Sequence, residues 1–386
     1  MAKDVMSLRR GKLFAAQQAA QMRLQLYITG RTHALLLAFA RKARGILLDV
    51  AGGELAALDG VGMNTAIERL TAAWAVTFRA WQRLFESARR ETALLPFGRL
   101  AVEHELVFAP ARKVLAEAQV GAASIPFYEP QLQALLDAAN QRLYGDGFKL
   151  SQRIWRLDQD SLEGIRRVVY QGVVEGRSAW QIAEQVEQFL GAGQDCPRWT
   201  DVRLYGLTKQ DIADGDRTGL FTKEECVGQG VAYNALRLAR TELQYVHALA
   251  HDAIAAKTPW VEMQQVHLSP SHPDIGCVCE EIVAGGEKGD GVYPKGELPM
   301  QRPFHPHCLC WVEDILMEPD AFVARLHGWV DGSDPWPGMD EYARWVGMNP
   351  KDFTTPLLWP VTRGLQLWLW GSKDELDKQI DEGAEA

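Results

Sequence analysis

Apolar side chains recur at helical spacing over most of the first 260 residues of the chain. The clearest run lies between residues 65 and 92, where apolar residues follow one another at intervals of three or four: Ile67, Leu70, Trp74, Phe78, Trp81 and Phe85. Such intervals place side chains on one face of an α-helix. We therefore predict an amphipathic helix that closes near Arg89 and Arg90. Its aromatic stripe is expected to face a core rather than a cofactor, because helical periodicity alone accounts for it.

Helices are predicted on both sides of this run. Residues 15–48 are rich in Ala, Leu, Gln and Arg and contain no proline, which favours one or two helices with a break at Gly30. Two more helical stretches lie near 100–118 and 130–144, on either side of a segment that contains Gly and Pro. We therefore expect residues 1–145 to form an all-α amino-terminal region.

Residues 151–191 carry the signals of a helical hairpin. Gly176 suits the left-handed position that ends a helix, and Ser178 with Gln181 fits the capping box that starts the next one. Apolar residues on either side of this turn have helical spacing: Leu162, Ile165, Val169 and Val173, then Ile182, Val186 and Leu190. After a predicted loop at 191–221, Thr222 and Glu225 form a second capping box, which predicts a long helix over about 223–255.

That long helix contains the triplet Arg240, Thr241 and Glu242. Arg240 and Glu242 lie about 200° apart around a helix, so they must contact different neighbours. We expect a structural role for the triplet, tying the helix to the segment that follows, rather than catalysis. His247 and His251 have the spacing of zinc-protease ligands, but no glutamate lies between them to act as a base, so we do not predict a metal site there.

The character of the sequence changes beyond Lys257. Residues 267–312 are dense in Pro, Gly, His and Cys without sustained periodicity, so they need a stabilising cross-link, such as a metal ion or disulfides, to fold. Residues 317–371 are rich in Trp and Pro, with a short helix predicted at 319–327, and the last fifteen residues resemble a frayed acidic tail.

The predicted fold is mainly α. A helical region at 1–145 is followed by a unit at 146–316, which holds an α+β, loop-rich Cys/His module at 267–312. An irregular carboxy-terminal extension occupies 317–386.

Composition points to a folded, soluble, cytosolic protein. The chain has 386 residues, 47% of them hydrophobic and 24% charged, with a net charge of −9. It shows neither a signal peptide nor an apolar run of membrane-spanning length. Residues 1–50 contain nine basic and two acidic residues, a local balance of +7 that leaves about −16 for the remainder. This basic arm suits contact with DNA or an acidic partner, although a solvated helix face explains it equally well. We expect a chain that starts near Gly53 to keep its fold.

Four of the six cysteines fall within 34 residues: Cys277, Cys279, Cys308 and Cys310. In a cytosolic chain, cysteines clustered with histidines indicate metal binding before disulfides. Two disulfides or four inert thiols are the alternative. Cys196 and Cys226 stand apart and are interpreted as ordinary thiols.

The predicted metal is one structural zinc ion, because zinc takes four tetrahedral ligands from thiolate and imidazole groups. The predicted ligand set is drawn from His272, Cys277, Cys279, His305, Cys308 and Cys310, with Asp274 and His307 as further candidates. Neighbours in a Cys-x-Cys pair seldom both fit one ion, so one cysteine of each pair is expected to be a spectator. So many candidates favour a closed site, whereas a catalytic zinc keeps one position open to water.

The order of these motifs resembles the phage head morphogenesis family, the Mu F-like minor head proteins. The chain reads Arg240-Thr241-Glu242 in a helix, then HLSPSHPDIGCVCEE, then GVYPKGELP, then HPHCLC. The family shows a helical Arg-Thr-Glu, a His-Pro followed by Asp and Cys, a Gly-rich stretch ending in Pro, and His-Pro-x-Cys-x-Cys. The resemblance covers roughly residues 150–315. Cys279, which precedes two glutamates, matches the family's single cysteine better than Cys277 does, and His307 replaces a small polar residue.

The resemblance implies a structural minor capsid protein of a tailed phage, not an enzyme. It would lie in the virion, inside the head or at the portal vertex, after assembly in the host cytoplasm. Its expected partners are the portal protein and capsid or scaffold proteins, with possible DNA contact through residues 1–50 and no membrane. We expect it to aid head assembly and DNA packaging or ejection, with the helices and Trp-rich residues 329–370 as docking surfaces.

Two other classes of function stay open. A zinc-dependent nuclease or hydrolase would use His307, Asp274 or Glu280 beside the metal. A zinc-bearing DNA-binding module would need a basic patch around the cysteines, which the sequence lacks.

Overall fold

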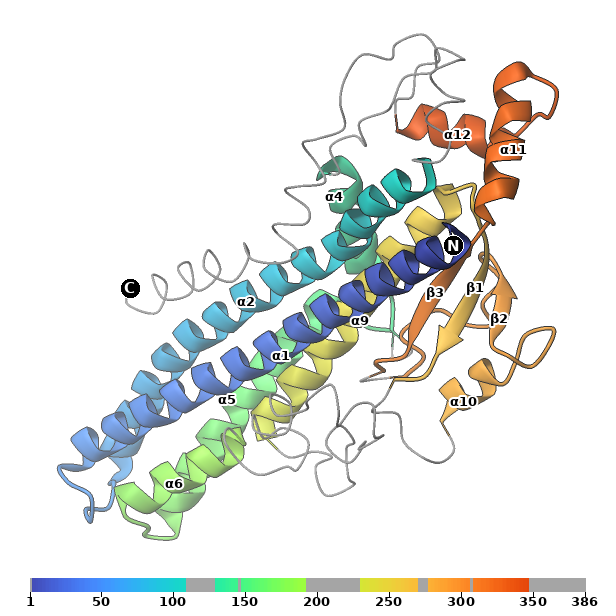
Figure 1. Ribbon diagram of the computed structural model, residues 1–386. Helices are drawn as coiled ribbons and strands as arrows, with labels where there is room; N and C mark the ends of the chain where they lie inside the picture. The colour runs from blue at the N-terminus through green and yellow to red at the C-terminus, as the bar shows by residue number, and fades with distance from the viewer. Residues whose placement is uncertain are drawn as a thin grey trace.

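The computed structural model describes residues 2–108, 129–144, 147–191, 230–269, 277–305 and 308–346. The chain is mainly helical with one small sheet, which confirms the predicted fold class (Figure 1). The helices of the bundle are α1 (Ala2–Ala51), α2 (Gly60–Phe108), α4 (Glu129–Gln141), α5 (Leu150–Val174), α6 (Ala179–Leu190) and α9 (Gly230–Lys257). The carboxy-terminal elements are β1 (Val261–His267), α10 (Val278–Val283), β2 (Val292–Pro294), β3 (Trp311–Leu316), α11 (Pro319–Asp331) and α12 (Pro337–Trp345).

The two longest helices, α1 and α2, form an antiparallel pair that spans the length of the molecule (Figure 1). The predicted break at Gly30 is wrong, because α1 continues through it. The glycine costs about 1 kcal/mol relative to alanine, and the buried neighbours Ile28 and Thr29 offset that cost. The predicted closure near Arg90 is also wrong. Helix α2 continues through Pro96 to Phe108 because the residues around the proline are buried, among them Phe97.

The hairpin of α5 and α6 agrees with its sequence signals. Gly176 takes a left-handed conformation with φ 67°. Both hydrogen bonds of the Ser178–Gln181 capping box are present: each side chain accepts from the backbone amide of the other residue. The turn of this hairpin meets the turn between α1 and α2, where the Ala179 amide donates to the Ala56 carbonyl at 2.9 Å. The two hairpins are therefore joined at the end of the bundle that lies away from the sheet (Figure 1).

The main core lies between α1, α2, α5, α6 and α9. The predicted aromatic stripe on α2 faces into it: Trp81 and Phe85 stack with ring centroids 5.3 Å apart, and Trp74 meets Phe39 of α1 edge to face. Ile165 and Val186 from the hairpin pack into the same core, so residues on both sides of position 145 share it. The boundary predicted at that position remains a prediction.

Residues 1–50 are not a separable arm in this fold. Ile28, Phe39 and Leu47 of α1 are completely or almost completely buried in the main core. The expectation that a chain starting near Gly53 keeps its fold is therefore wrong, because such a truncation removes one wall of the bundle.

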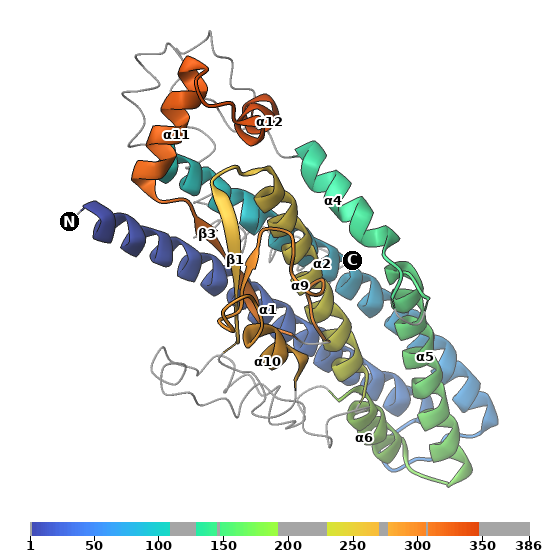
Figure 2. The same cartoon turned by 90° about the vertical axis from the view of Figure 1, so that its right-hand side faces the viewer.

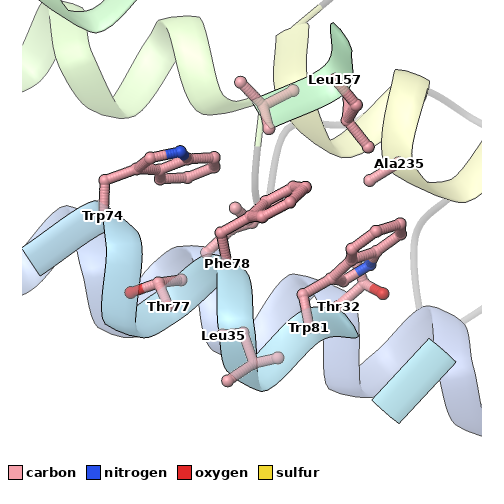
Figure 3. A pocket seen from close by; sticks show the side chains of 10 residues that line it. Thr32, Leu35, Trp74, Thr77, Phe78, Trp81, Leu157 and Ala235 are labelled. Carbon is pink, nitrogen blue, oxygen red and sulfur yellow. The ribbon is translucent and has the colours of Figure 1, made fainter. Parts of the chain in front are cut away.

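A small cavity of about 10 Å³ lies within the main core, between α1, α2, α5 and α9 (Figure 3). Trp74, Phe78 and Trp81 project into it from α2. Thr32 of α1 and Leu157 of α5 also line it, and the surface of the cavity is apolar. Neither the Trp81 Nε1 atom nor the Thr32 Oγ1 atom has a hydrogen-bond partner in the described structure.

A second core joins the carboxy-terminal helices to the end of α2. Trp260, which precedes β1, packs edge to face against Tyr342 of α12 at 4.7 Å and against Phe108 of α2. The predicted short helix at 319–327 is confirmed and extends to Asp331 as α11. Trp336 is buried in this core and is not a docking anchor, while residues 347–370 of the predicted Trp-rich surface lie outside the described residues.

The sheet has the strand order β2-β1-β3, with both pairings antiparallel. It lies beside α9 and the amino-terminal half of α1, with α10 at one end (Figure 2). Within the described ranges, no helix is long and apolar enough to cross a membrane.

Candidate metal centre

The Cys/His module brings two distant pairs of cysteines together around the sheet. Cys277 is the N-cap residue of α10 and Cys279 lies in its first turn, while Cys308 and Cys310 immediately precede β3. Both segments lie at the same end of the sheet because β1 and β3 pair antiparallel, with His267 opposite Trp311. Separations of about 30 residues in sequence therefore become direct contacts in space.

Two groups of potential ligand atoms overlap at Cys279. The first contains Cys277, Cys279 and His305, and the second contains Cys279, Cys308 and Cys310; within each group all ligand atoms lie within 4.8 Å of one another. These five residues belong to the six predicted as ligands. The sixth, His272, lies outside the described residues, as do Asp274 and His307.

The sulfur geometry fits a shared metal ion and not a disulfide. The Sγ atoms of Cys279 and Cys308 lie 3.7 Å apart, whereas a disulfide bond is about 2.05 Å long. Two thiolates on one tetrahedral zinc ion would lie about 3.8 Å apart, because each Zn–S bond is about 2.3 Å long. The four described cysteines are free thiols. Cys279, Cys308 and Cys310 can therefore hold a metal ion.

The three thiols of the second group are closed off from solvent. Cys279 is 0% exposed, and Cys308 and Cys310 are each 1% exposed. They lie in a small apolar cluster with Val266 and Phe304. Hydrogen bonds with Cys279 and Cys310 lower the pKa of the Cys308 thiol well below its usual 9, whereas hydrogen bonds with Cys308 and Cys310 raise the pKa of Cys279. The pKa of Cys310 is raised as well: its hydrogen bond with Cys279 lowers it, but the bond with Cys308 and burial outweigh that effect. The arrangement therefore favours a thiolate at Cys308, and the thiolate is the form of cysteine that binds metals.

Groups around the cluster hold Cys310 from two sides. The Ser269 amide donates a hydrogen bond to Cys310 Sγ at 3.4 Å, and the Gln244 side chain of α9 donates to the Cys310 carbonyl at 2.9 Å. Such outer contacts orient metal ligands and stabilise the charge on a thiolate. Gln244 was not singled out from the sequence, because a single buried glutamine on a long helix gives no local signal.

Arg240 and Glu242 of the Arg-Thr-Glu triplet contact different neighbours, as predicted. Arg240 donates from Nη2 to Thr29 of α1 at 2.9 Å, while Glu242 meets the Tyr144 hydroxyl and lies 3.7 Å from Arg142. The two charged residues thus contact different neighbours. These contacts lead to α1 and to the segment before α5, whereas the contact with the cysteine module is made by Gln244 on the same helix.

His251 belongs to a buried ion network that the sequence did not predict. Its Nε2 lies 3.2 Å from Asp314 of β3, and its Nδ1 lies 3.0 Å from Arg302 Nη2. Arg99 of α2 completes the network by pairing with the same Asp314 carboxylate. The i, i+4 charges Arg99 and Glu103 on α2 were the available signal, but Asp314, the partner of Arg99, lies 215 residues away. His247, by contrast, meets Gln17 of α1 at 2.8 Å.

Comparison with protein-family models, curated proteins and solved structures found no match to this chain.

Proposed function

We propose that Cys279, Cys308, Cys310 and His305 bind one zinc ion. The three thiols supply a mutually close, buried set, and the fourth ligand is His305 or Cys277. Cys277 and His305 both belong to the first group, beside Cys279, but His305 also interacts with the Cys308 thiol and lowers its pKa, and we therefore favour His305. Cys277 then does not bind the ion, whereas Cys308 and Cys310 both do, contrary to the expectation that one cysteine of each Cys-x-Cys pair is a spectator.

This zinc ion is structural in our proposal. Four protein ligands close the coordination sphere, while catalysis requires a position for water or substrate. Among its described residues, the module around the site has three short strands and one short helix, and their shared apolar core is small. A bound zinc ion adds folding free energy to such a segment, on the order of 10 kcal/mol in small peptides.

We further propose that the chain is a structural minor head protein of a tailed phage. The proposal is carried by the ordered set of residues from Arg240 to Cys310. Supporting it, the two ends of that set meet in space, because Gln244 of the Arg-Thr-Glu helix binds the carbonyl of Cys310. The long helices of the bundle offer extended surfaces for docking on the portal and on capsid or scaffold proteins.

The metal proposal is tested by elemental analysis of the purified full chain in reducing buffer. We expect about one zinc ion per chain. Cys308→Ser should lose the metal, and Cys277→Ser, the matched control, should retain it. Protein that contains no metal, or equal loss in the two variants, would contradict the proposed site.

The assembly role is tested in particles. Mass spectrometry of purified virions should find the protein far below the abundance of the major capsid protein, and co-expression with the portal should yield a complex. Metal-dependent cleavage of DNA or peptide bonds, abolished by Glu280→Gln or His307→Ala without loss of zinc, would instead support the nuclease or hydrolase alternative.

DNA contact through the basic amino terminus is tested without truncation, since α1 belongs to the core. Replacing Lys3, Arg9, Arg10 and Lys12 with glutamine should weaken DNA binding and reduce its dependence on salt, because each phosphate contact releases counterions. Equal binding and an equal salt slope would assign the charges to a solvated helix face.

A further inference from the structure

One face of α1 carries buried polar residues at every fourth position: Gln17, Gln21, Gln25 and Thr29. An interval of four keeps side chains on the same face of a helix. This face lies against α9, which runs beside α1 (Figure 2). We call these four residues the polar ladder.

Each member of the polar ladder contacts α9 at a matching position. Gln17 Nε2 lies 2.8 Å from His247 Nε2, and Gln21 Nε2 donates to the side-chain oxygen of Gln244. Further along the two helices, Gln25 Nε2 donates to the Arg240 carbonyl at 3.4 Å and Thr29 accepts from the Arg240 guanidinium. The interface between residues 14–29 of α1 and α9 is therefore built largely from side-chain hydrogen bonds.

Such an interface gives residues 14–29 of α1 little net stability against α9. The residues of α1 in the main core begin at Ile28, and the buried side-chain oxygens of Gln17 and Gln25 lack partners in the described structure. An unpaired buried acceptor costs free energy, and each hydrogen bond gains only a little over its counterpart in water. The packing of residues 14–29 against α9 is therefore weakened when one hydrogen-bonding group on α9 changes its position.

One of those partners belongs to the metal centre. Gln244 accepts from Gln21 and donates from Nε2 to the Cys310 carbonyl at 2.9 Å. Cys310 carries both that carbonyl and one of the three clustered thiols. A metal ion that fixes the thiol of Cys310 also fixes the carbonyl that orients Gln244. The chain of hydrogen bonds from Gln21 through Gln244 to Cys310 therefore connects α1 to the site.

We propose that metal binding at the cysteine cluster holds residues 14–29 of α1 against α9, and that loss of the metal releases this segment while the rest of the bundle stays folded. The inference rests on the metal site proposed above and adds its regulation. Losing the Cys310 acceptor leaves the buried Gln244 amide unpaired. We expect a coupling of about 5- to 150-fold in the opening equilibrium of residues 14–29.

Hydrogen exchange of the full chain, with zinc bound and after chelation, tests the coupling. Amides of residues 14–29 should exchange about 5- to 150-fold faster after chelation, while those of the α5–α6 hairpin keep their rates. The variant Gln244→Met, at saturating zinc, should give residues 14–29 nearly the exchange rate of the metal-free protein, and chelation should add little. Because coupling is reciprocal, Gln244→Met should also weaken zinc binding by a similar factor.

Gln25→Met is the matched control, because it removes a rung of the polar ladder that does not lead to Cys310. It should loosen residues 14–29 but keep the response to chelation. Chelation that removes zinc without changing exchange at residues 14–29 would overturn the inference and leave the metal site intact. A full chelation response in Gln244→Met would overturn it as well. Absence of metal from the wild-type chain would instead refute the proposed site itself.

Discussion

Arg99 on α2 and Asp314 on β3 form an ion pair whose side chains are only 4% and 1% exposed. The pair joins the helical bundle to the sheet across 215 residues of sequence. The other carboxylate oxygen of Asp314 accepts a hydrogen bond from Gln264 at 2.9 Å, and His251 lies 3.2 Å from the oxygen that Arg99 binds. Buried charge of this kind is tolerated only when it is paired and hydrogen-bonded.

Replacing Asp314 with asparagine should destabilise the protein strongly. The change removes the closer of two buried carboxylates beside Arg99 and leaves Glu103, 3.5 Å from the Arg99 Nε atom. Breaking a buried ion pair by removing one partner typically costs about 3–5 kcal/mol. Asp49→Asn is the matched control, because it breaks an ion pair with Arg69 in which the side chains are 67% and 45% exposed. Its free energy of unfolding should change by less than about 1 kcal/mol. Urea unfolding measures the free energy of unfolding of both variants. Similar losses in the two would show that the buried network does not stabilise the contact between bundle and sheet.

The same pair predicts a loss of stability in acid. Burial alone would raise the pKa of Asp314, but the charges of His251 and Arg99 hold it well below the usual 3.8. A carboxyl whose folded pKa is depressed stabilises the fold above its unfolded pKa, about 3.9, and loses that contribution as the pH falls towards the folded pKa. The difference in unfolding free energy between wild type and Asp314→Asn should therefore shrink below about pH 4. A difference that stays constant down to pH 2.5 would contradict this assignment.

Two helical glycines should respond in opposite ways to alanine. A Cβ atom at Gly164 of α5 would lie 2.0 Å from the ring of Phe189, whereas one at Gly45 of α1 would meet no atom within 4 Å. Gly164→Ala requires the ring of Phe189 or the hairpin itself to move, and it should destabilise by about 1–3 kcal/mol. Gly45→Ala should stabilise by about 0.5–1 kcal/mol, because alanine loses less backbone entropy in a helix. Thermal or urea unfolding checks the pair, and stabilisation by both would mean that α5 and α6 pack less closely.

The core cavity should stay dry. Its volume of about 10 Å³ is at the lower limit for a water molecule, and only apolar surface lines it, so the Trp81 Nε1 and Thr32 Oγ1 atoms do not face it. A high-resolution crystal structure should show no water there. Thr32→Val should leave the fold at least as stable as the wild type in urea unfolding, because it removes a buried hydroxyl that has no hydrogen-bond partner in the described structure. An ordered water on Trp81, with a loss of about 1 kcal/mol in Thr32→Val, would contradict this prediction.

The sequence alone determined what depends on local interactions. The stripe from Ile67 to Phe85 gave the core face of α2, and Gly176 with the Ser178–Gln181 capping box gave the turn between α5 and α6, because periodicity and caps act within a few residues. The clustering of cysteines also marked the candidate metal centre, since a segment poor in apolar residues needs another source of stability. Where local signals and packing disagree, as at Gly30 and Pro96, packing prevailed, because burial over a long helix outweighs one unfavourable residue.

Only the tertiary structure decided the partners of the buried polar residues. Nothing near Asp314 in sequence identifies Arg99, and nothing near Gln21 identifies Gln244 or the carbonyl of Cys310. The role of α1 as a wall of the core was likewise decided by packing, although its composition suggested a detachable basic arm. Pattern and propensity report which face of an element is buried, whereas a hydrogen bond or ion pair requires two groups to meet with the right geometry. That meeting is set by how the whole chain packs.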